Sequence, residues 1–244
     1  MKALIFAAGL GTRLRPLTDT MPKALVPVNG EPLLKHLILR LKDAGYDDIV
    51  VNVHHFAGQI KAYLASEDFG VKLGISDESG QLMDTGGGVL FAEKLLRGEG
   101  SFLAHNVDIF SNISFEALRE AARKEALATL VASERETARY LLVDDSGRLV
   151  GWTNVKTSQL RSPYPGLDPR KYRHLAFAGI HLLSDRIFDA MRSCGLSGAF
   201  PIMDFYLDHC DKFPVYVHVP ENFRVLDVGK TESLAEAETL LKAL

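Results

Sequence analysis

Small residues followed by cations near the amino terminus have the composition of a phosphate-binding loop. The apolar residues 3–6 predict a buried strand, and residues 7–13 then read Ala-Ala-Gly-Leu-Gly-Thr-Arg. Glycines let backbone N–H groups approach a ligand closely, and arginine can grip a phosphate with two parallel hydrogen bonds. Lys23 follows Pro22, where a stiffened loop could hold its charge over the phosphates. These residue types in this order predict a site for a nucleoside triphosphate.

Two well-known glycine loops do not fit this stretch. A P-loop requires Lys-Ser or Lys-Thr directly after its last glycine, whereas Thr12 and Arg13 follow Gly11. The dinucleotide fingerprint requires three spaced glycines that open a helix, and only Gly9 and Gly11 are present. An ordinary strand-to-loop turn that carries two solvated arginines, Arg13 and Arg15, therefore stays open as an alternative at this point.

The rest of the chain alternates apolar runs of strand length with helical periodicity. Leu33, Leu37 and Leu41 recur at helical spacing before Gly45, which predicts a helix. Strands that alternate with helices predict an α/β fold, doubly wound around a mainly parallel sheet, and residues 140–152 add a small β-hairpin. Further strands are expected at residues 48–53, 71–75, 102–108, 128–133, 175–183 and 215–219, and further helices at residues 57–64, 89–96, 114–125, 184–192 and 202–210.

The carboxy-terminal segment predicts a closing helix over residues 232–244. Thr231 would be its N-cap, accepting a hydrogen bond from the first turn. Between the hairpin and this helix, residues 157–173 are rich in Pro, Arg and Tyr, which predicts a mobile loop near a site. The residues expected on the inward face of the closing helix are Leu234, Ala235, Leu240 and Leu241.

Two further elements carry residues that could act on a nucleotide. Residues 84–88, Asp-Thr-Gly-Gly-Gly, open a helical pattern, and three glycines would let a flat object lie against bare backbone. A merely flexible turn is the alternative. Asp108 ends the strand at residues 102–108, and the carboxyl end of a parallel strand faces the ligand cleft, where Mg²⁺ bound to phosphates needs oxygen ligands. Its alternative role is to cap the next helix.

The full pattern adds a family resemblance. Residues 7–28 carry A-A-G-x-G-T-R-L-x-P-L-T followed by P-K-x-L-x-P-V, which strongly resembles the signature of the sugar-phosphate nucleotidylyltransferases. The pattern departs at Ala24, where that family usually has a second proline. Residues 84–88 resemble the E-T-G-G-G of the bacterial N-acetylmuramate 1-phosphate uridylyltransferases, and residues 224–231 resemble the family's W-x-D-x-G-T. The resemblance implies a Rossmann-like, GT-A-like fold and transfer of a nucleoside monophosphate to a sugar 1-phosphate with release of pyrophosphate.

The same resemblance implies roles for individual residues. Arg13, Lys23, Asp108 and Asp227 would be catalytic, and the two aspartates would bind Mg²⁺. Val107 replaces the family's glycine before Asp108, which adds a side chain beside the nucleotide. The other nucleotide-binding residues would be Ala8, Gly9, Gly11, Thr12, Thr85, Gly86 and Gly87. The sugar-binding residues would be Asn106, Glu134, Gly179 and Lys156, although a solvated lysine is an equal alternative for the last.

Composition bounds the class of protein. At 244 residues with a formal charge of −3, the chain can bury a good core and offers no general basic field, so a nucleic-acid partner is not expected. No segment is long and apolar enough to span a bilayer, so no membrane partner is expected. Cys194 and Cys210 are isolated thiols that fit a reducing cytoplasm. The expectation is a single catalytic domain over residues 1–244, a monomer or homodimer without a C-terminal left-handed β-helix domain.

The substrates implied by the resemblance are UTP and N-acetylmuramate 1-phosphate. Three alternatives lie within the same class of enzyme, namely a mannose 1-phosphate guanylyltransferase, a glucose 1-phosphate thymidylyltransferase and a phosphocholine cytidylyltransferase. A different class of protein, a nucleotide-sugar sensor without the reaction, is disfavoured because a sensor would not need both Asp108 and Asp227. The sequence leaves the base and the sugar open.

Overall fold

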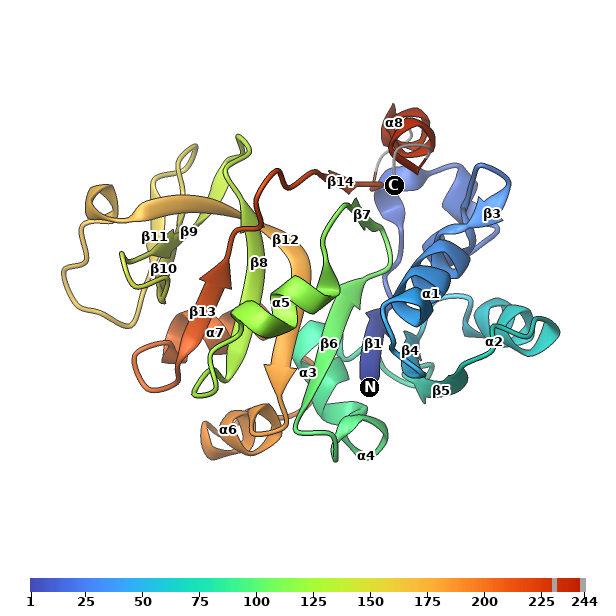
Figure 1. Ribbon diagram of the computed structural model, residues 1–244, viewed down its shortest axis with the longest axis horizontal. Helices are drawn as coiled ribbons and strands as arrows, with labels where there is room; N and C mark the ends of the chain where they lie inside the picture. The colour runs from blue at the N-terminus through green and yellow to red at the C-terminus, as the bar shows by residue number, and fades with distance from the viewer. Residues whose placement is uncertain (230–231, 242–244) are drawn as a thin grey trace.

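The computed structural model describes residues 1–229 and 232–241 and contains one large mixed sheet with helices on both faces (Figure 1). Within these residues, strands run in the order β11-β10-β9-β12-β6-β1-β4-β5, and β8 and β13 continue the sheet from β12. Strands β6, β1, β4 and β5 are parallel, whereas β12 is antiparallel to β6, β8 and β9. The strands are β1 (Lys2–Phe6), β4 (Asp48–Val53), β5 (Lys72–Asp77), β6 (Ser101–Asn106), β8 (Ala128–Ser133), β9 (Arg139–Val143), β10 (Leu149–Asn154), β11 (Gln159–Arg161), β12 (Arg173–Ser184) and β13 (Val215–His218).

Helices bury two separate cores against the two faces of this sheet. Side chains of β1 alternate between them, so that Ala3 and Ile5 enter one core while Leu4 and Phe6 enter the other. One core is covered by α1 (Leu33–Asp43), α2 (Ala57–Ser66), α5 (Phe115–Ala121) and α8 (Glu232–Leu241). The other is covered by α3 (Asp84–Phe91), α4 (Glu93–Leu96), α6 (Ile187–Ser193) and α7 (Ile202–His209). None of the helices in the described residues is long and apolar enough to cross a membrane.

Short elements complete the chain. Two small antiparallel ladders pair β2 (Pro27–Val28) with β3 (Glu31–Pro32) and β7 (Ile109–Ser111) with β14 (Val225–Asp227). The single-turn 3₁₀ helices are η1 (Thr12–Leu14), η2 (Leu17–Asp19), η3 (Lys23–Leu25) and η4 (Pro169–Lys171). Three of these four turns follow β1, so the first loop is a compact excursion and not an open coil.

The predicted α/β class is confirmed, and the hairpin at residues 140–152 is β9 and β10. The antiparallel part of the sheet around this hairpin is larger than expected, because β11 and β12 pair with its two strands. Residues 157–173 are not wholly loop, because they contain β11 and η4, and β11 pairs with β10. Strand β12 then joins this antiparallel part to the parallel strands through β6. Pairing with a partner strand, which local composition does not reveal, turned the expected loop into a sheet edge.

The helices differ from the expectation in their bounds and, in α8, in the buried face. The helix expected over residues 89–96 begins at Asp84 and is divided at Ala92 into α3 and α4. The helix expected over residues 114–125 ends at Ala121, because no large apolar side chain in residues 122–125 continues its buried face. In α8, Ala235 is exposed and Ala237 is buried instead, whereas Leu234, Leu240 and Leu241 pack inward as expected. The predicted cap, Thr231, lies outside the described residues.

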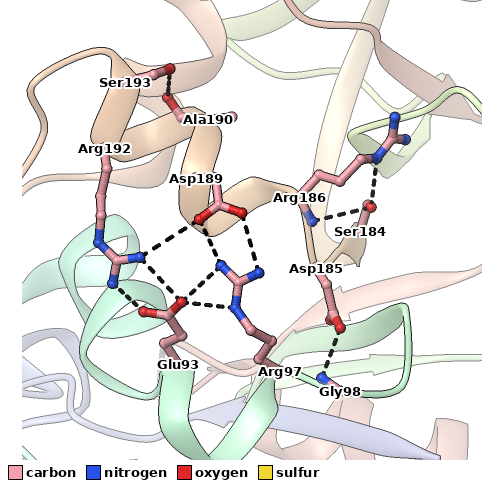
Figure 2. Close-up of polar contacts among 10 residues, drawn as sticks. All are labelled: Glu93, Arg97, Gly98, Ser184, Asp185, Arg186, Asp189, Ala190, Arg192 and Ser193. Atoms are coloured by element: carbon pink, nitrogen blue, oxygen red, sulfur yellow. Dashed lines mark hydrogen bonds and ion pairs between the residues drawn. The ribbon is translucent and has the colours of Figure 1, made fainter.

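An ion-pair network joins α4 to α6 on the surface (Figure 2). Arg97 donates two hydrogen bonds to Asp189, at 2.9 and 3.2 Å, and one to Glu93 at 2.9 Å. Arg192 of α6 reaches back to Glu93 and donates to Oε1 at 3.1 Å. The hydrogen bond from Arg192, followed by that from Arg97, lowers the pKa of the Glu93 carboxyl group despite its partial burial. Glu93 is therefore the shared acceptor of the network.

The same surface fixes the relative positions of two strand ends. Asp185 accepts hydrogen bonds from the backbone N–H groups of Gly98 and Gly100, at 2.8 and 3.0 Å. Strand β12 ends at Ser184, and β6 begins at Ser101. Polar contacts thus hold the start of β6 against the end of β12, at the edge opposite the carboxyl ends of the parallel strands.

We expect Glu93→Gln to lower the melting temperature by about 1–3 °C at pH 7, since exposed ion pairs contribute little each. A lowered pKa in the folded state stabilises the fold above the ordinary glutamate value of 4.5, and this stabilisation is lost as pH falls through the folded-state pKa. The difference between wild type and variant should therefore shrink in calorimetry as pH falls below 4.5. Glu120→Gln, at an exposed position of α5, is the matched control. A difference that persists unchanged at pH 3 would contradict the electrostatic account.

Candidate active site

The loop after β1 is anchored from the neighbouring strand β4. The side-chain oxygen of Asn52 accepts hydrogen bonds from the N–H groups of Ala7 and Ala8, at 2.7 and 3.2 Å. The Asn52 side-chain nitrogen donates to Glu78 at 2.9 Å, and the other Glu78 oxygen accepts from the Met83 N–H at 3.1 Å. Glu78 is 1% exposed, and burial raises the pKa of its carboxyl group. The N–H of Ala8 is therefore already hydrogen-bonded within the protein. The sequence had suggested that N–H groups of this loop would bind a phosphate.

Beyond this anchor, the loop turns at Gly11 and packs on Lys23. Gly11 has φ of +65°, which favours glycine, and its carbonyl accepts hydrogen bonds from the Thr18 hydroxyl at 2.8 Å and the Leu14 N–H at 2.9 Å. A Cβ at Gly11 would lie 3.1 Å from Cβ of Lys23. At Gly9, in contrast, no atom lies within 4 Å of the Cβ position, so this part of the loop has room for a ligand.

A short ladder brings two distant aspartates onto adjacent backbones. In the pairing of β7 with β14, Asp227 lies opposite Ile109. The Val228 N–H extends the ladder by donating to the Asp108 carbonyl at 2.8 Å. Asp108 and Asp227 thus become neighbours although about half of the chain separates them.

Each of these aspartates forms an ion pair with a cation of the first loop. Asp108 pairs with Lys23, and their side chains are only 14% and 12% exposed. Asp227 lies 3.5 Å from Arg13, where both side chains are more exposed. A Cβ at Gly229 would lie 2.5 Å from both Arg13 and Asp227, so the glycine leaves room for this pair. Oδ1 of Asp227 is buried, and it has no hydrogen-bond partner among the described residues.

The alternative role of Asp108 as a helix cap is wrong. Asp108 is followed by β7, and the next helix, α5, is capped by Ser114, whose Oγ accepts from the Ala117 N–H at 3.1 Å. On the strand before Asp108, His105 is fully buried and its burial lowers its pKa to about 4, so the ring is neutral at neutral pH. Its Nδ1 donates to the Asn106 carbonyl at 2.8 Å. The Asp108 carboxylate therefore does not cap a helix, and it pairs with Lys23 of the first loop instead.

Each ion pair lines its own cavity. Lys23 and Asp108 line a cavity of about 300 Å³, which we call the first cavity. Arg13 and Asp227 line a cavity of about 940 Å³, the second cavity. The first cavity is also lined by Ala8, Gly9, Asn52, Glu78, Thr85 and Asn106. The second is also lined by Arg135, Arg139, Trp152, Asn154, Arg161 and Phe177. Because the aspartates lie on adjacent backbones, the two cavities approach each other at this point.

Comparison with known proteins decides the family. Residues 2–149, more than half of the chain, match the family model described as nucleotidyl transferase. The chain belongs to the nucleotidyl transferase family. The matched region includes the first loop, Lys23 and Asp108, whereas Asp227 lies beyond it.

Two curated relatives share close sequence similarity with this nucleotidyl transferase. The N-acetylmuramate alpha-1-phosphate uridylyltransferase of Caulobacter vibrioides is 46% identical over 109 residues, which are 43% of this chain and 45% of the relative. The protein of the same name from Neisseria meningitidis serogroup B is 42% identical over 123 residues, 50% of this chain and 53% of the relative. The chain thus spans about half the length of the curated relatives it matches.

A solved structure shares the whole fold at low sequence identity. HddC from Yersinia pseudotuberculosis, crystallised in complex with GMP-PN, superposes with a TM-score of 0.76 at 21% identity. The alignment covers 98% of this chain and 99% of that one. The similarity extends through the antiparallel part of the sheet, so the Rossmann-like nucleotidyltransferase fold applies to both halves.

Gly86 and Gly87 of α3 pack against other parts of the protein, whereas the sequence predicted that they contact the nucleotide. The N–H groups of Gly86 and Gly87 donate to the Phe200 carbonyl, at 2.8 and 3.2 Å. Their missing side chains make room for the Phe200 ring and the Gly198 backbone. Both glycines are buried and lie outside the lining of the first cavity, whereas Thr85 lines it. The structure therefore uses Gly86 and Gly87 to pack α3 closely, because a glycine needed by a protein contact looks the same in sequence as one needed by a ligand.

Of the four residues expected to contact the sugar, two lie together. Gly179 has φ of +74°, and a Cβ there would lie 2.8 Å from the side-chain nitrogen of Asn106. Glu134 is 75% exposed and pairs with Arg173 at 3.2 Å, and Lys156 is exposed on the turn after β10. Within the described part of the chain, neither Glu134 nor Lys156 lines the first or second cavity. Both residues follow the end of a strand, as Asp108 does, but both are exposed. A position directly after a strand is therefore not enough to place a side chain in a cavity.

Asn52 and Glu78 are site residues that the sequence interpretation missed. Asn52 is a polar residue within the apolar run of β4, and this interruption was the available signal. Glu78 follows the polar end of β5, where the sequence gives no such signal. Their contact also explains a third glycine, because a Cβ at Gly88 would lie 2.9 Å from the Glu78 carboxylate. The residues that hold the first loop thus come from β4, the end of β5 and α3.

We expect Gly87→Ala to lower the free energy of unfolding by about 1–3 kcal/mol, because its Cβ would displace the Gly198 backbone. Helix propensity alone would favour alanine by about 1 kcal/mol, so a loss isolates the steric effect. Gly80→Ala is the matched control, because its Cβ would meet no atom within 4 Å. Urea unfolding followed by circular dichroism measures both, and equal stability of the two variants would contradict the packing role.

Proposed function

We propose that this chain transfers a uridylyl group from UTP to N-acetylmuramate 1-phosphate, giving a nucleotide-sugar and pyrophosphate. The observation that carries the proposal is the placing of Asp108 and Asp227 on adjacent backbones, where each pairs with a cation of the first loop and lines a cavity. One cavity would take the nucleotide and the other the sugar phosphate. The names of the two uridylyltransferase relatives and the Asp-Thr-Gly-Gly-Gly element support the choice of substrates.

The reaction needs no nucleophile from the protein. An oxygen of the sugar phosphate would attack the α-phosphorus of the triphosphate, forming the new P–O bond as the bond to pyrophosphate breaks. The protein's contribution is then alignment of two anions and neutralisation of their charge. Lys23, held in the first cavity, would offset charge where the two anions approach. Arg13 would stabilise the departing pyrophosphate together with N–H groups of the loop from Gly9 to Thr12.

A divalent cation fits the two aspartates. Asp227 has a buried oxygen without a partner among the described residues, and both side chains are hard oxygen donors. No group of three or more His, Cys, Asp or Glu side chains is arranged for a metal in the described residues. Mg²⁺ commonly uses one or two carboxylates and completes its shell with water and substrate phosphates. We therefore propose Asp108 and Asp227 as its ligands, where the ion would neutralise phosphate charge.

The location proposed for this activity is the cytoplasm. Both cysteines are free thiols, Cys210 is buried, and burial raises the pKa of the Cys210 thiol to about 12. Such thiols suit a reducing compartment, which also supplies nucleoside triphosphates.

The substrate proposal is tested by mixing the purified chain with Mg²⁺, each of the four nucleoside triphosphates and a panel of sugar 1-phosphates. We expect the fastest release of pyrophosphate with UTP and N-acetylmuramate 1-phosphate. A higher rate with GTP and mannose 1-phosphate, dTTP and glucose 1-phosphate, or CTP and phosphocholine would reassign the substrates within the class. Binding of a nucleotide-sugar without pyrophosphate release from any pair would instead indicate a sensor.

We expect Lys23→Ala and Asp108→Ala each to lower kcat by about 10²- to 10³-fold, because each removes a charge placed where the anions meet. Circular dichroism should show a folded protein in both cases. Lys94→Ala, at an exposed position of α4, removes the same charge elsewhere and should leave kcat unchanged. Pyrophosphate release at near wild-type rates by either site variant would refute its role.

A further inference from the structure

One wall of the second cavity carries more positive charge than its carboxylates balance. Arg161 is held by Asp204 at 2.6 Å and Asp208 at 3.0 Å, and these contacts raise its pKa. Arg13 is paired with Asp227. These two arginines are therefore already neutralised by neighbours in the folded chain.

Arg135 and Arg139 are different. One guanidinium nitrogen of Arg135 donates to the Phe177 carbonyl at 3.0 Å, which holds the side chain near the cavity. The Thr137 N–H donates to the Tyr140 hydroxyl at 2.9 Å. This hydrogen bond holds the loop that links the two arginines against β9. Within the described residues, no carboxylate lies within 4.0 Å of either guanidinium group, yet both side chains line the second cavity.

The register of the hairpin places an apolar floor beside these charges. Arg139 lies opposite Asn154, and Leu141 lies opposite Trp152. All four line the second cavity, which means that one face of β9 and β10 forms its floor. A flat indole with an aliphatic neighbour suits the face of a sugar ring, and the unpaired cation at the edge suits an anion attached to that ring.

Arg139 lies in the same cavity as one of the two aspartates. Asp227 and Arg13 line the second cavity together with Arg135 and Arg139, and its volume is about 940 Å³. A cavity of this size takes a ligand larger than a bare sugar ring. A sugar 1-phosphate whose phosphate lies beside Asp227 would therefore reach Arg139 through a second substituent on its ring.

We infer that the acceptor carries a second anionic group, a carboxylate on the sugar ring, and that Arg139 binds it with support from Arg135. This inference rests on the proposed function and adds the residues that select its acceptor. The carboxylate of a lactyl ether, as in N-acetylmuramate 1-phosphate, supplies this charge on a substituent of the ring. N-acetylglucosamine 1-phosphate has the same ring and phosphate without that ether, so the two sugars form a matched pair.

The test compares Arg139→Gln with wild type on these two sugar phosphates. We expect kcat/KM for the carboxylate-bearing sugar to fall by about 10- to 100-fold, mainly through a higher KM, because the contact is made before and during the reaction. The value for N-acetylglucosamine 1-phosphate should stay within about twofold, since it makes no such contact. Arg170→Gln, which removes an exposed arginine paired with Asp168, should change neither value.

Equal losses on both sugars would overturn the inference, because Arg139 would then bind the phosphate that they share. Unchanged values on both sugars would overturn it as well. Titration calorimetry of both sugars with wild type and Arg139→Gln gives an independent readout, in which only the carboxylate-bearing sugar should bind more weakly to the variant. Failure of the wild type to release pyrophosphate with any sugar would refute the proposed function, while the calorimetry would still decide the role of Arg139.

Discussion

The pairing of β7 with β14 is the contact on which the site depends. Neither segment has a catalytic geometry alone, since Asp108 lies in a turn after β6 and Asp227 lies near the carboxy-terminal end of the chain. Three residues on each side and the added hydrogen bond from Val228 to Asp108 bring the two aspartate backbones together. Each carboxylate pairs with a cation of the first loop, Asp108 with Lys23 and Asp227 with Arg13. The first loop is thereby held to the sheet by charge as well as by backbone contacts.

Burial makes the two ion pairs unequal. Lys23 and Asp108 are largely removed from water, so an approaching phosphate would meet an already desolvated cation. Arg13 and Asp227 are more open to solvent and closer to the larger cavity. On the other side of the loop, the buried side chains of Asn52 and Glu78 hold Ala7 and Ala8 through hydrogen bonds. The base of the site is thus buried and hydrogen-bonded, whereas the ion pair at the larger cavity is open to solvent.

Local patterns were enough to predict the parts of the site that one segment forms by itself. The first loop, Lys23 and Asp108 follow strands whose ends are visible in the sequence, and parallel strands bring such ends to one edge. Contacts between residues far apart in the sequence could not be predicted in this way. Gly86 and Gly87 are explained only by Phe200 and Gly198, which sequence spacing does not connect with them. Alternation in the hairpin at residues 140–152 shows that Leu141 shares one face with Arg139, but not that this face, which contributes Leu141 to a core, also lines a cavity.

Strand β12 joins the hairpin of β9 and β10 to the parallel strands that carry the first loop. The family match ends at residue 149, the first residue of β10, so Trp152 and Asn154 of the floor formed by β9 and β10 lie beyond it. Surface substitutions in that hairpin would leave the hydrogen bonds of the first loop and the pairing of β7 with β14 untouched. The lining of the second cavity can therefore be altered without disturbing the contacts that position Lys23 and Asp108.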